Sequence, residues 1–468
     1  MISSRRKRLR PAVVILVLTA SIGAVAQNQP KSSAAEPMAL DSHISAALQQ
    51  VSAERIRANV EKMVSFGTRS TISAQDAAAI EAGHGIGAAR AWIKLEFERY
   101  SRDCGGCLEV KVDSFTEPAA DRIPQPTVIT NVYAVLKGTD AENEKRIVLV
   151  TGHYDSRNSD ILDVKGDAPG ANDDASGAAV SLECARVLSK MKFPATMIFL
   201  TVAGEEQGLN GSQHFAKMAK EQGWNLEAAL NNDIVGGDKS AEQDHSVVRV
   251  FSEGLPAAAT EQEIRRIRGL GGENDSASRQ LARYIDDVGS AYYKDVGVES
   301  VLVFRLDRYL RGGDHSSFNQ QGFAAVRFTE FREDFHHQHQ NVRTENGIEY
   351  GDLTKFVDFD YVGRVARLNA ATLASLASAP APPANVHLLT KDLENDSTLT
   401  WENSPGGLAT GYEVLWRATT SPKWEYVQKV GAVNRATLKL SKDNVIFAVR
   451  AVDKQGHRSL AVVPTPER

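Results

Sequence analysis

"RIVLVTGHYDSRNSD", residues 146–160, joins an apolar run to a histidine and an aspartate two positions apart, His153 and Asp155. In an extended segment the side chains of residues i and i+2 face the same side, so these two can converge. Asp155 can then accept the proton on the imidazole nitrogen that does not bind a metal. Taken alone, the pair is more typical of a polar strand end than of a metal site.

The apolar run is one of several β-branched segments that predict strands. These segments are "LEVKVDSF" (108–115), "VITNVYAVLKG" (128–138), "RIVLVTG" (146–152), "ATMIFLTVAG" (195–204) and "AAVRFT" (324–329). Helical patterns accompany them at 52–66, with Ser52 as a cap, at 89–100 and at 176–192. Strands that alternate with helices predict an α/β domain with a mostly parallel central sheet flanked by helices. Ligand sites of such sheets lie beyond the carboxyl ends of the strands, where His153 stands.

Residues 1–26 have the pattern of a secretory signal peptide, with a cationic start, an apolar run and the small-residue site "AVA" at 24–26. The apolar run is shorter than the roughly 20 residues of a membrane-spanning helix, which makes an uncleaved anchor the weaker alternative. We expect a secreted or periplasmic protein without membrane association, in which residues 27–40 form a linker. Cleavage removes five cations and no anions, so the formal net charge goes from -5 to about -10, which argues against a nucleic-acid partner.

The chain has three cysteines. In an exported protein, Cys104 and Cys107 of "CGGC" are expected to close a small disulfide loop. Cys184 lies in the helical pattern at 176–192 and is expected to be a buried free thiol.

A second domain is predicted at the C-terminus. The Ala/Pro segment 379–384 ends a helical pattern and indicates a linker, after which short strand candidates alternate with turn-rich segments. Residues 385–468 therefore predict an all-β sandwich. Trp401, Tyr412 and "FAVRAVDKQGHRS" resemble a fibronectin type III domain. We expect this region to bind a surface, a glycan or a protein, or to act as a spacer.

Four clusters of acidic or imidazole side chains follow predicted strands, and a fifth comes later in the chain. They are "GHYD" (152–155), "GANDDASG" (170–177), "AGEEQG" (203–208), "NNDIVGG" (231–237) and "FHHQHQN" (335–341). Several carboxylates buried in one cleft need a counter-charge, which divalent cations supply. Nitrogen and oxygen ligands without thiolates suit zinc best, with cobalt or manganese as alternatives.

In this order and spacing, the clusters resemble the M28 family of co-catalytic zinc exopeptidases, the aminopeptidase type, as one domain over residues 41–378. The resemblance implies two zinc ions and no other cofactor. It implies that His153 and Asp233 bind one ion, that Glu206 binds the other and that Asp173 bridges both.

The last ligand is harder to place. Family members end the site with a histidine in a pattern like Tyr-His-Thr-x-x-Asp, and this chain offers His336, His337 and His339. Counting four residues back from Asn341, which takes the place of the acid, selects His337. If Phe335 takes the place of the tyrosine, His336 is selected instead. We predict His337 as the ligand.

The resemblance implies that Glu205 is the general base, which takes a proton from a water shared by the metals and returns it to the leaving amine. Asp155 is the second residue expected to serve catalysis, because it tunes His153. The prediction is a secreted di-zinc aminopeptidase that acts on peptides. Alternatives are a carboxypeptidase or a glutaminyl-cyclase-like enzyme on the same fold, or a non-catalytic adhesion protein.

Overall fold

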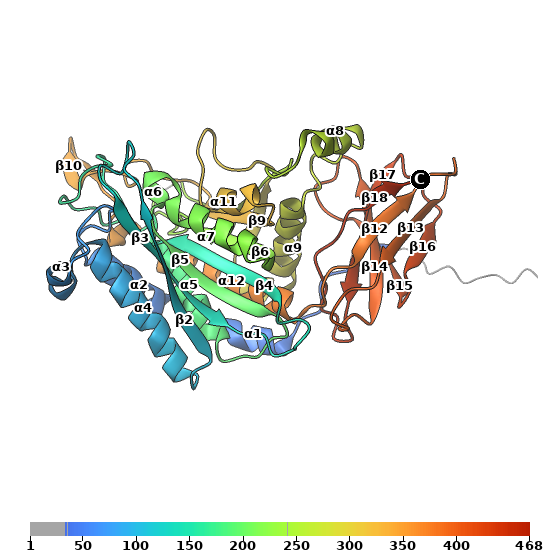
Figure 1. The fold of residues 1–468 in the computed structure, drawn as a ribbon, viewed down its shortest axis with the longest axis horizontal. Coiled ribbons are helices and arrows are strands. Elements are labelled where there is room, and N and C mark those ends of the chain that lie inside the picture. Colours follow the sequence, from blue (N-terminus) through green and yellow to red (C-terminus); the bar gives the residue numbers. More distant parts are fainter. Residues whose placement is uncertain (1–32, 35, 241) are drawn as a thin grey trace, which may run out of the picture. The chain divides into compact units, whose positions relative to one another are not determined.

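An eight-stranded sheet forms the centre of the larger region of the protein (Figure 1). The computed structural model describes residues 33, 34, 36–240 and 242–468, so the predicted signal peptide (1–26) lies outside the described residues. In spatial order the strands are β2 (Leu108–Glu117), β3 (Thr127–Leu136), β5 (Thr196–Val202), β4 (Arg146–His153), β6 (Asn225–Asn232), β9 (Ala325–Glu330), β7 (Val247–Ser252) and β8 (Glu299–Val303).

The middle of the sheet is parallel. Strands β5, β4, β6 and β9 are neighbours that run in one direction, and β7 runs parallel to β8. Antiparallel pairs join β2 to β3, β3 to β5 and β9 to β7. The expected α/β fold with a mostly parallel sheet is therefore confirmed. Because neighbouring parallel strands end at the same edge, residues that follow β4, β5 and β6 are brought together.

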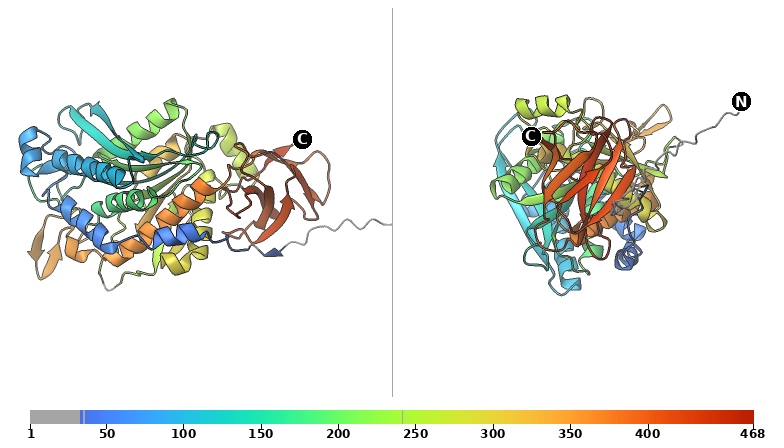
Figure 2. Two further views of the ribbon diagram at one scale, coloured as in Figure 1. Left: turned by 90° about the horizontal axis from the view of Figure 1, so that it is seen from below. Right: turned by 90° about the vertical axis from the view of Figure 1, so that its right-hand side faces the viewer.

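Helices cover both faces of the sheet (Figure 2). One core contains side chains of α2 (Ala53–Val64), α4 (Gly85–Asp103), α5 (Ala175–Leu188), α9 (Ala277–Ala291) and α12 (Phe359–Ser378), and the other those of α7 (Asn210–Glu221) and α11 (His315–Gln320). Within β4, Val148 and Val150 belong to the first core and Leu149 to the second. Burial on both faces explains why "RIVLV" is apolar at successive positions.

Shorter elements connect these layers. They are α1 (Ser42–Leu48), α3 (Ala77–Ala82), α6 (Glu205–Gly208), α8 (Glu261–Gly269), α10 (Tyr293–Val296), the 3-10 helix η1 (Thr354–Phe356) and the hairpin of β10 (Arg343–Glu345) and β11 (Ile348–Tyr350). Among the described residues, no helix combines the length and the hydropathy needed to cross a bilayer.

The predicted helices are present. Ser52 caps α2, since its side chain accepts a hydrogen bond from the backbone N of Arg55 at 3.2 Å. Of the apolar residues at helical spacing in this segment, Ile56, Val60 and Met63 are buried and Val64 is partly buried. The second expected helix is α4, which begins a few residues earlier than its apolar pattern indicated.

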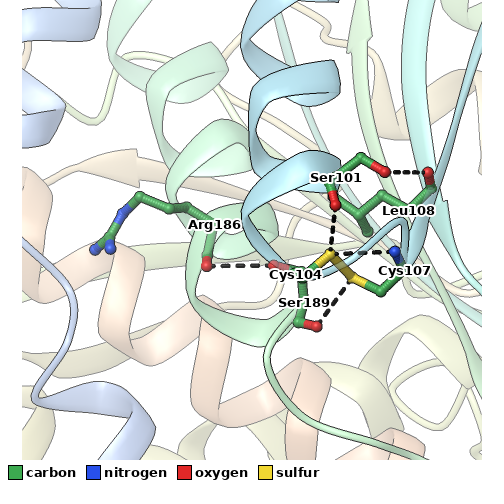
Figure 3. The surroundings of a disulfide bond; sticks show 6 residues. All are labelled: Ser101, Cys104, Cys107, Leu108, Arg186 and Ser189. Atoms are coloured by element: carbon green, nitrogen blue, oxygen red, sulfur yellow. Dashed lines mark hydrogen bonds between the residues drawn. A yellow bond between two sulfur atoms is a disulfide. The ribbon is translucent and has the colours of Figure 1, made fainter.

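The "CGGC" segment forms a disulfide between Cys104 and Cys107, in the turn that links α4 to β2 (Figure 3). The backbone N of Cys107 donates to Cys104 Sγ at 3.3 Å, and Ser101 Oγ donates to the carbonyl of Leu108 at 2.7 Å. Cys184 is a buried free cysteine, and burial raises the pKa of its thiol. Both expectations about the cysteines are confirmed.

The C-terminal region is built of β-strands, as predicted. One sheet has the order β1-β15-β14-β17 and the other β16-β13-β12-β18. Their strands are β12 (Ala384–Leu389), β13 (Ser397–Glu402), β14 (Gly411–Ala418), β15 (Tyr426–Gly431), β16 (Arg435–Leu438), β17 (Val445–Val452) and β18 (Thr465–Glu467), together with β1 (Ser33–Ala34). Trp401 and Tyr412 pack in the shared core with ring centroids 5.5 Å apart. The more specific likeness to a fibronectin type III domain stays a prediction.

The described part of the segment expected to be a linker, 27–40, contacts the C-terminal region. Strand β1 pairs antiparallel with β15. Beyond it, the carboxylate of Glu36 lies 2.8 Å from Lys429 Nζ, and its backbone carbonyl accepts a hydrogen bond from Arg458 at 3.0 Å. The segment before α1 therefore contributes the strand β1 to the sheet that contains β15.

Candidate metal centre

The predicted clusters meet at the edge where the parallel strands end. His153 is the last residue of β4, Glu206 lies in α6 shortly after β5, and Asp233 directly follows β6. Asp173 precedes α5, whose N-cap is Asp174, and the peptide bond between these two aspartates is cis. The four clusters that follow strands in the sequence therefore form one site.

Two groups of three side chains make up this site, and we call them the first and the second trio. In the first trio, His153 Nε2 lies 3.2 Å from Asp173 Oδ1 and 3.9 Å from Asp233 Oδ1. In the second trio, His339 Nε2 lies 2.9 Å from Asp173 Oδ2 and 3.1 Å from Glu206 Oε1. Asp173 thus belongs to both trios, with one carboxylate oxygen in each.

The donor atoms of the two trios fit divalent cations. Two atoms about 2.1 Å from one zinc ion, at a tetrahedral angle, lie about 3.4 Å apart, close to the separations seen here. Among the described residues, the buried Nε2 of His153 has no hydrogen-bond partner, so its lone pair is available to a cation. Nitrogen and carboxylate donors without a thiolate are a set that zinc accepts.

The charges of the site also favour a cation. Burial raises the pKa of Glu205 well above its ordinary value, and Asp233 raises it further, although His153 opposes them. Burial likewise raises the pKa of Glu206, with a contribution from Asp173. Carboxylates with raised pKa values lack sufficient counter-charge from the surrounding side chains, and a divalent cation supplies it.

His337, the predicted last ligand, lies in neither trio. Its Nδ1 is 2.6 Å from Asp238 Oδ2, and its ring stacks on Phe356 with the centroids 3.5 Å apart. The alternative, His336, is also elsewhere, with a half-exposed side chain. The histidine of the second trio is His339.

There is a local reason why the spacing argument did not point to His339. It required Asn341 to act as the acid of the family pattern, but Asn341 Oδ1 accepts a hydrogen bond from the backbone N of Ser159 at 3.2 Å. His339 has a left-handed backbone with φ of 53°, which turns the chain locally. Counting residues therefore did not identify the side chain that enters the site.

Asp155 lies beside His153, as predicted. Its backbone carbonyl is 3.1 Å and its Oδ1 3.3 Å from His153 Nδ1. Its other oxygen, Oδ2, accepts hydrogen bonds from Thr71 Oγ1 at 2.8 Å and from the backbone N of Glu206 at 3.2 Å. Asp155 therefore connects the histidine of the first trio to the chain that carries Glu206.

Three residues that support the site were not predicted. Asp352 accepts hydrogen bonds from the backbone N atoms of Asn172 and Asp173, both at 2.7 Å, and Gln338 donates to Asp173 Oδ2 at 3.0 Å. Arg327 lies 2.8 Å from Asp233 Oδ1. Of these three, only Arg327 stands out in the sequence, because it is a charged residue inside an apolar strand. Nothing in the sequence around Asp352 or Gln338 indicated their positions.

A cavity of about 360 Å³ opens beside the trios. The carboxylates on its wall are those of Asp173, Glu205, Glu206 and Asp233. Glu205 and Glu206 are adjacent, but only Glu206 contacts a histidine of the trios. Among the described residues, no group donates a hydrogen bond to the Glu205 carboxylate, so its oxygens are free to contact a molecule in the cavity.

Comparison with known proteins identifies the family of the chain. The sequence model of peptidase family M28 matches residues 131–358, a range that contains both trios. A relative from Pyrenophora tritici-repentis, named a probable zinc metalloprotease, is 46% identical over 435 residues, which cover 92% of this chain and 88% of the relative.

Two solved structures show the same fold at low identity. The LapA aminopeptidase of Legionella pneumophila has a TM-score of 0.51 at 20% identity, over 74% of this chain and 77% of that one. The glutaminyl cyclase of Macrostomum lignano has a TM-score of 0.50 at 15% identity, over 73% of this chain and 94% of that one. The fold is thus shared by enzymes with different reactions.

Proposed function

Because this chain belongs to peptidase family M28, we propose that it is a zinc aminopeptidase that binds two zinc ions and removes N-terminal residues from peptides. The observation that carries the proposal is the position of Asp173. One of its carboxylate oxygens is 3.2 Å from His153 Nε2 and the other is 2.9 Å from His339 Nε2. A carboxylate shared in this way suits a site for two metal ions.

The ligands follow from the two trios. His153 and Asp233 would hold one zinc ion, Glu206 and His339 the other, and Asp173 both. The relative from Pyrenophora tritici-repentis is named a probable zinc metalloprotease, which supports the choice of metal. The hydrogen bonds that Asp352 makes to the backbone of Asn172 and Asp173 hold the shared carboxylate in place.

The side chains of the site then have separate roles in the reaction. When bound, the zinc ions supply Lewis acidity, which polarises the scissile carbonyl group and lowers the pKa of the attacking water. Glu205 takes a proton from that water on a carboxylate oxygen and later donates it to the nitrogen of the leaving amine. Burial raises the pKa of Glu205 above its ordinary value, which favours uptake of the proton. Asp155 holds the imidazole of His153 so that Nε2 faces Asp173.

Activity assays distinguish this function from its rivals on the same fold. Purified protein would be given aminoacyl arylamides, peptides with blocked N-termini and peptides that begin with glutamine. We expect release of the arylamine from substrates with a free α-amine. Turnover of blocked peptides alone, or cyclisation of the glutamine peptides without hydrolysis, would overturn the aminopeptidase assignment.

Metal analysis tests the centre independently of activity. We expect two zinc ions per folded chain by elemental analysis. A folded chain that takes up no metal when incubated with zinc would remove the basis of the proposal, whatever hydrolysis is measured.

We also propose that the chain is exported with cleavage after Ala26 and that residues 385–468 form a fibronectin type III-like domain that binds a surface, a glycan or a protein. The disulfide between Cys104 and Cys107 supports an oxidising compartment. N-terminal sequencing of exported protein should begin at Gln27. Recovery of the intact N-terminus from the membrane fraction would contradict cleavage.

A further inference from the structure

Four arginines line the cavity beside the trios, and from them we propose that the site selects substrates with a carboxylate close to the scissile bond. They are Arg122, Arg157, Arg308 and Arg311. The inference rests on the proposed peptidase function and names the class of peptide on which it acts. The carboxylate comes either from an acidic first residue or from the free C-terminus of a very short peptide.

Two of these arginines carry charges that no carboxylate neutralises among the described residues. Arg122 lies between β2 and β3, and its guanidinium donates to the carbonyl of Glu206 at 3.1 Å. Arg157 follows β4, and its Nε donates to the carbonyl of Asn158 at 3.0 Å. Both guanidinium groups are therefore held by backbone carbonyls, and their positive charge is available to a ligand.

The other two arginines contact carboxylates, but these carboxylates are too few to neutralise the guanidinium groups around them. Arg308 and Arg311 lie 2.8 and 2.9 Å from Glu333 Oε2, and Arg249 contacts the same carboxyl group at 3.1 Å. Arg308 also lies 3.1 Å from Asp307. Since Glu333 is surrounded by three guanidinium groups, this side of the cavity keeps an excess of positive charge.

The acidic residues of the cavity do not remove that excess once zinc is bound. The carboxylates on the wall are those of Asp173, Glu205, Glu206 and Asp233, and two divalent cations carry the equal and opposite charge. The charge that remains is that of the guanidinium groups. A guanidinium binds a carboxylate through paired, charge-assisted hydrogen bonds, which a neutral amide of the same shape cannot reproduce.

Pairs of substrates that differ only in this charge test the proposal. Glutamyl arylamide is compared with glutaminyl arylamide, and the dipeptide Ala-Ala with its C-terminal amide. We expect kcat/KM to favour the charged member of at least one pair by about tenfold or more. The first pair reports an acidic side chain and the second a free C-terminus, so the pair that shows the preference identifies the source of the carboxylate.

Substitutions locate the preference in the cavity. Arg122→Gln and Arg157→Gln should each lower the ratio for the preferred pair, by up to about tenfold. The matched control is Arg265→Gln, because Arg265 is an exposed residue of α8 outside the cavity. It should leave the ratio unchanged.

A binding measurement separates this inference from the proposed function. The zinc-loaded Glu205→Gln variant is titrated calorimetrically with the dipeptides Glu-Ala and Gln-Ala, and with Ala-Ala and its amide. Tighter binding of a charged member without hydrolysis of any substrate by the wild type would support the carboxylate site and defeat the peptidase function. Equal kcat/KM values within both pairs would overturn the carboxylate site. A preference that persists in both Arg122→Gln and Arg157→Gln would also overturn it.

Discussion

The second trio and a neighbouring cluster contain the same kinds of side chain but differ in what those side chains already contact. Each combines one histidine with two carboxylates, His339 with Asp173 and Glu206 in the trio, and His337 with Asp238 and Asp334 in the cluster. In the trio, Asp173 also faces His153, whose Nε2 has no hydrogen-bond partner among the described residues. The trio is therefore part of a larger site, in which Nε2 of His153 is available to bind a cation.

In the neighbouring cluster, one ring nitrogen of His337 is held in a structural contact. Asp238 is 2.6 Å from Nδ1 of His337, and Phe356 covers the ring. Asp334 Oδ1 accepts a hydrogen bond from the backbone N of His336 at 2.9 Å. The comparison teaches that residue types alone do not define this site, because the trio shares Asp173 with the first trio and borders the cavity, whereas the neighbouring cluster does neither.

Removing the shared carboxylate should have the largest effect. Asp173→Ala takes one ligand from each proposed zinc ion, so we expect loss of both ions and of all measurable activity. Elemental analysis and a peptidase assay measure the two losses. Asp238→Ala is the matched control, since it removes a carboxylate from the neighbouring cluster and should keep both zinc ions. Full metal content in Asp173→Ala would exclude a shared ligand at this position.

Removing the proposed base should separate chemistry from metal binding. Glu205→Gln keeps the size of the side chain but cannot take up a proton, so kcat should fall by about 100-fold to 10,000-fold. Both zinc ions should remain, because Glu205 belongs to neither trio. A variant with unchanged kcat would show that another group moves the proton.

Substitutions of His339 and His337 test the comparison between the second trio and the neighbouring cluster directly. His339→Gln should weaken the affinity of one zinc ion by roughly 100-fold or more, beyond the usual effect of residues that only support ligands. His337→Gln should keep the full metal content. Competition with a zinc chelator measures the affinity in both variants. The reverse result, with metal lost in the His337 variant alone, would restore the original sequence prediction.

The smallest effect is expected at His457, where both ring nitrogens face carboxylates. Nδ1 is 2.8 Å from Asp453 and Nε2 is 3.2 Å from Asp41. The hydrogen bond that His457 donates to Asp453 is the main cause that raises the pKa of His457 in the folded protein. A raised folded pKa stabilises the protein fully below the unfolded value of about 6.5, and this stabilisation is lost as the pH rises through the folded pKa.

The matching measurement is the difference in Tm between the wild type and His457→Gln as the pH changes. We expect His457→Gln to lower Tm by no more than a few degrees at about pH 6 and by less at about pH 9. A difference that grows with pH would mean that the neutral imidazole, rather than the charged one, is stabilising.

Much of the site could be predicted because its residues lie close to recognisable elements. His153 ends an apolar strand, and Glu206 and Asp233 closely follow two others. Parallel strands bring such positions together whatever the loops between them do. Asp155 could be placed from its spacing to His153 alone, because side chains two apart in an extended segment face the same side.

The remaining residues could not be predicted because no regular element relates them to the site. His339 follows β9 only after an irregular segment, with a left-handed backbone of its own, and Asp352 comes after the β10–β11 hairpin. The arginines of the cavity come from three loops, with Arg308 and Arg311 together in the one between β8 and α11. In such segments the direction of a side chain depends on contacts with distant residues, which no local pattern records.

The sequence by itself determined the α/β sheet and the C-terminal β region, because hydrophobic periodicity is a local property of the chain, and the resemblance to the M28 family implied that His153, Asp173, Glu206 and Asp233 share one site. Only the tertiary structure decided that His339 rather than His337 completes the second trio, and that arginines surround the cavity. Those choices depend on how irregular segments place their side chains after the chain has folded, and that is a property of the whole molecule.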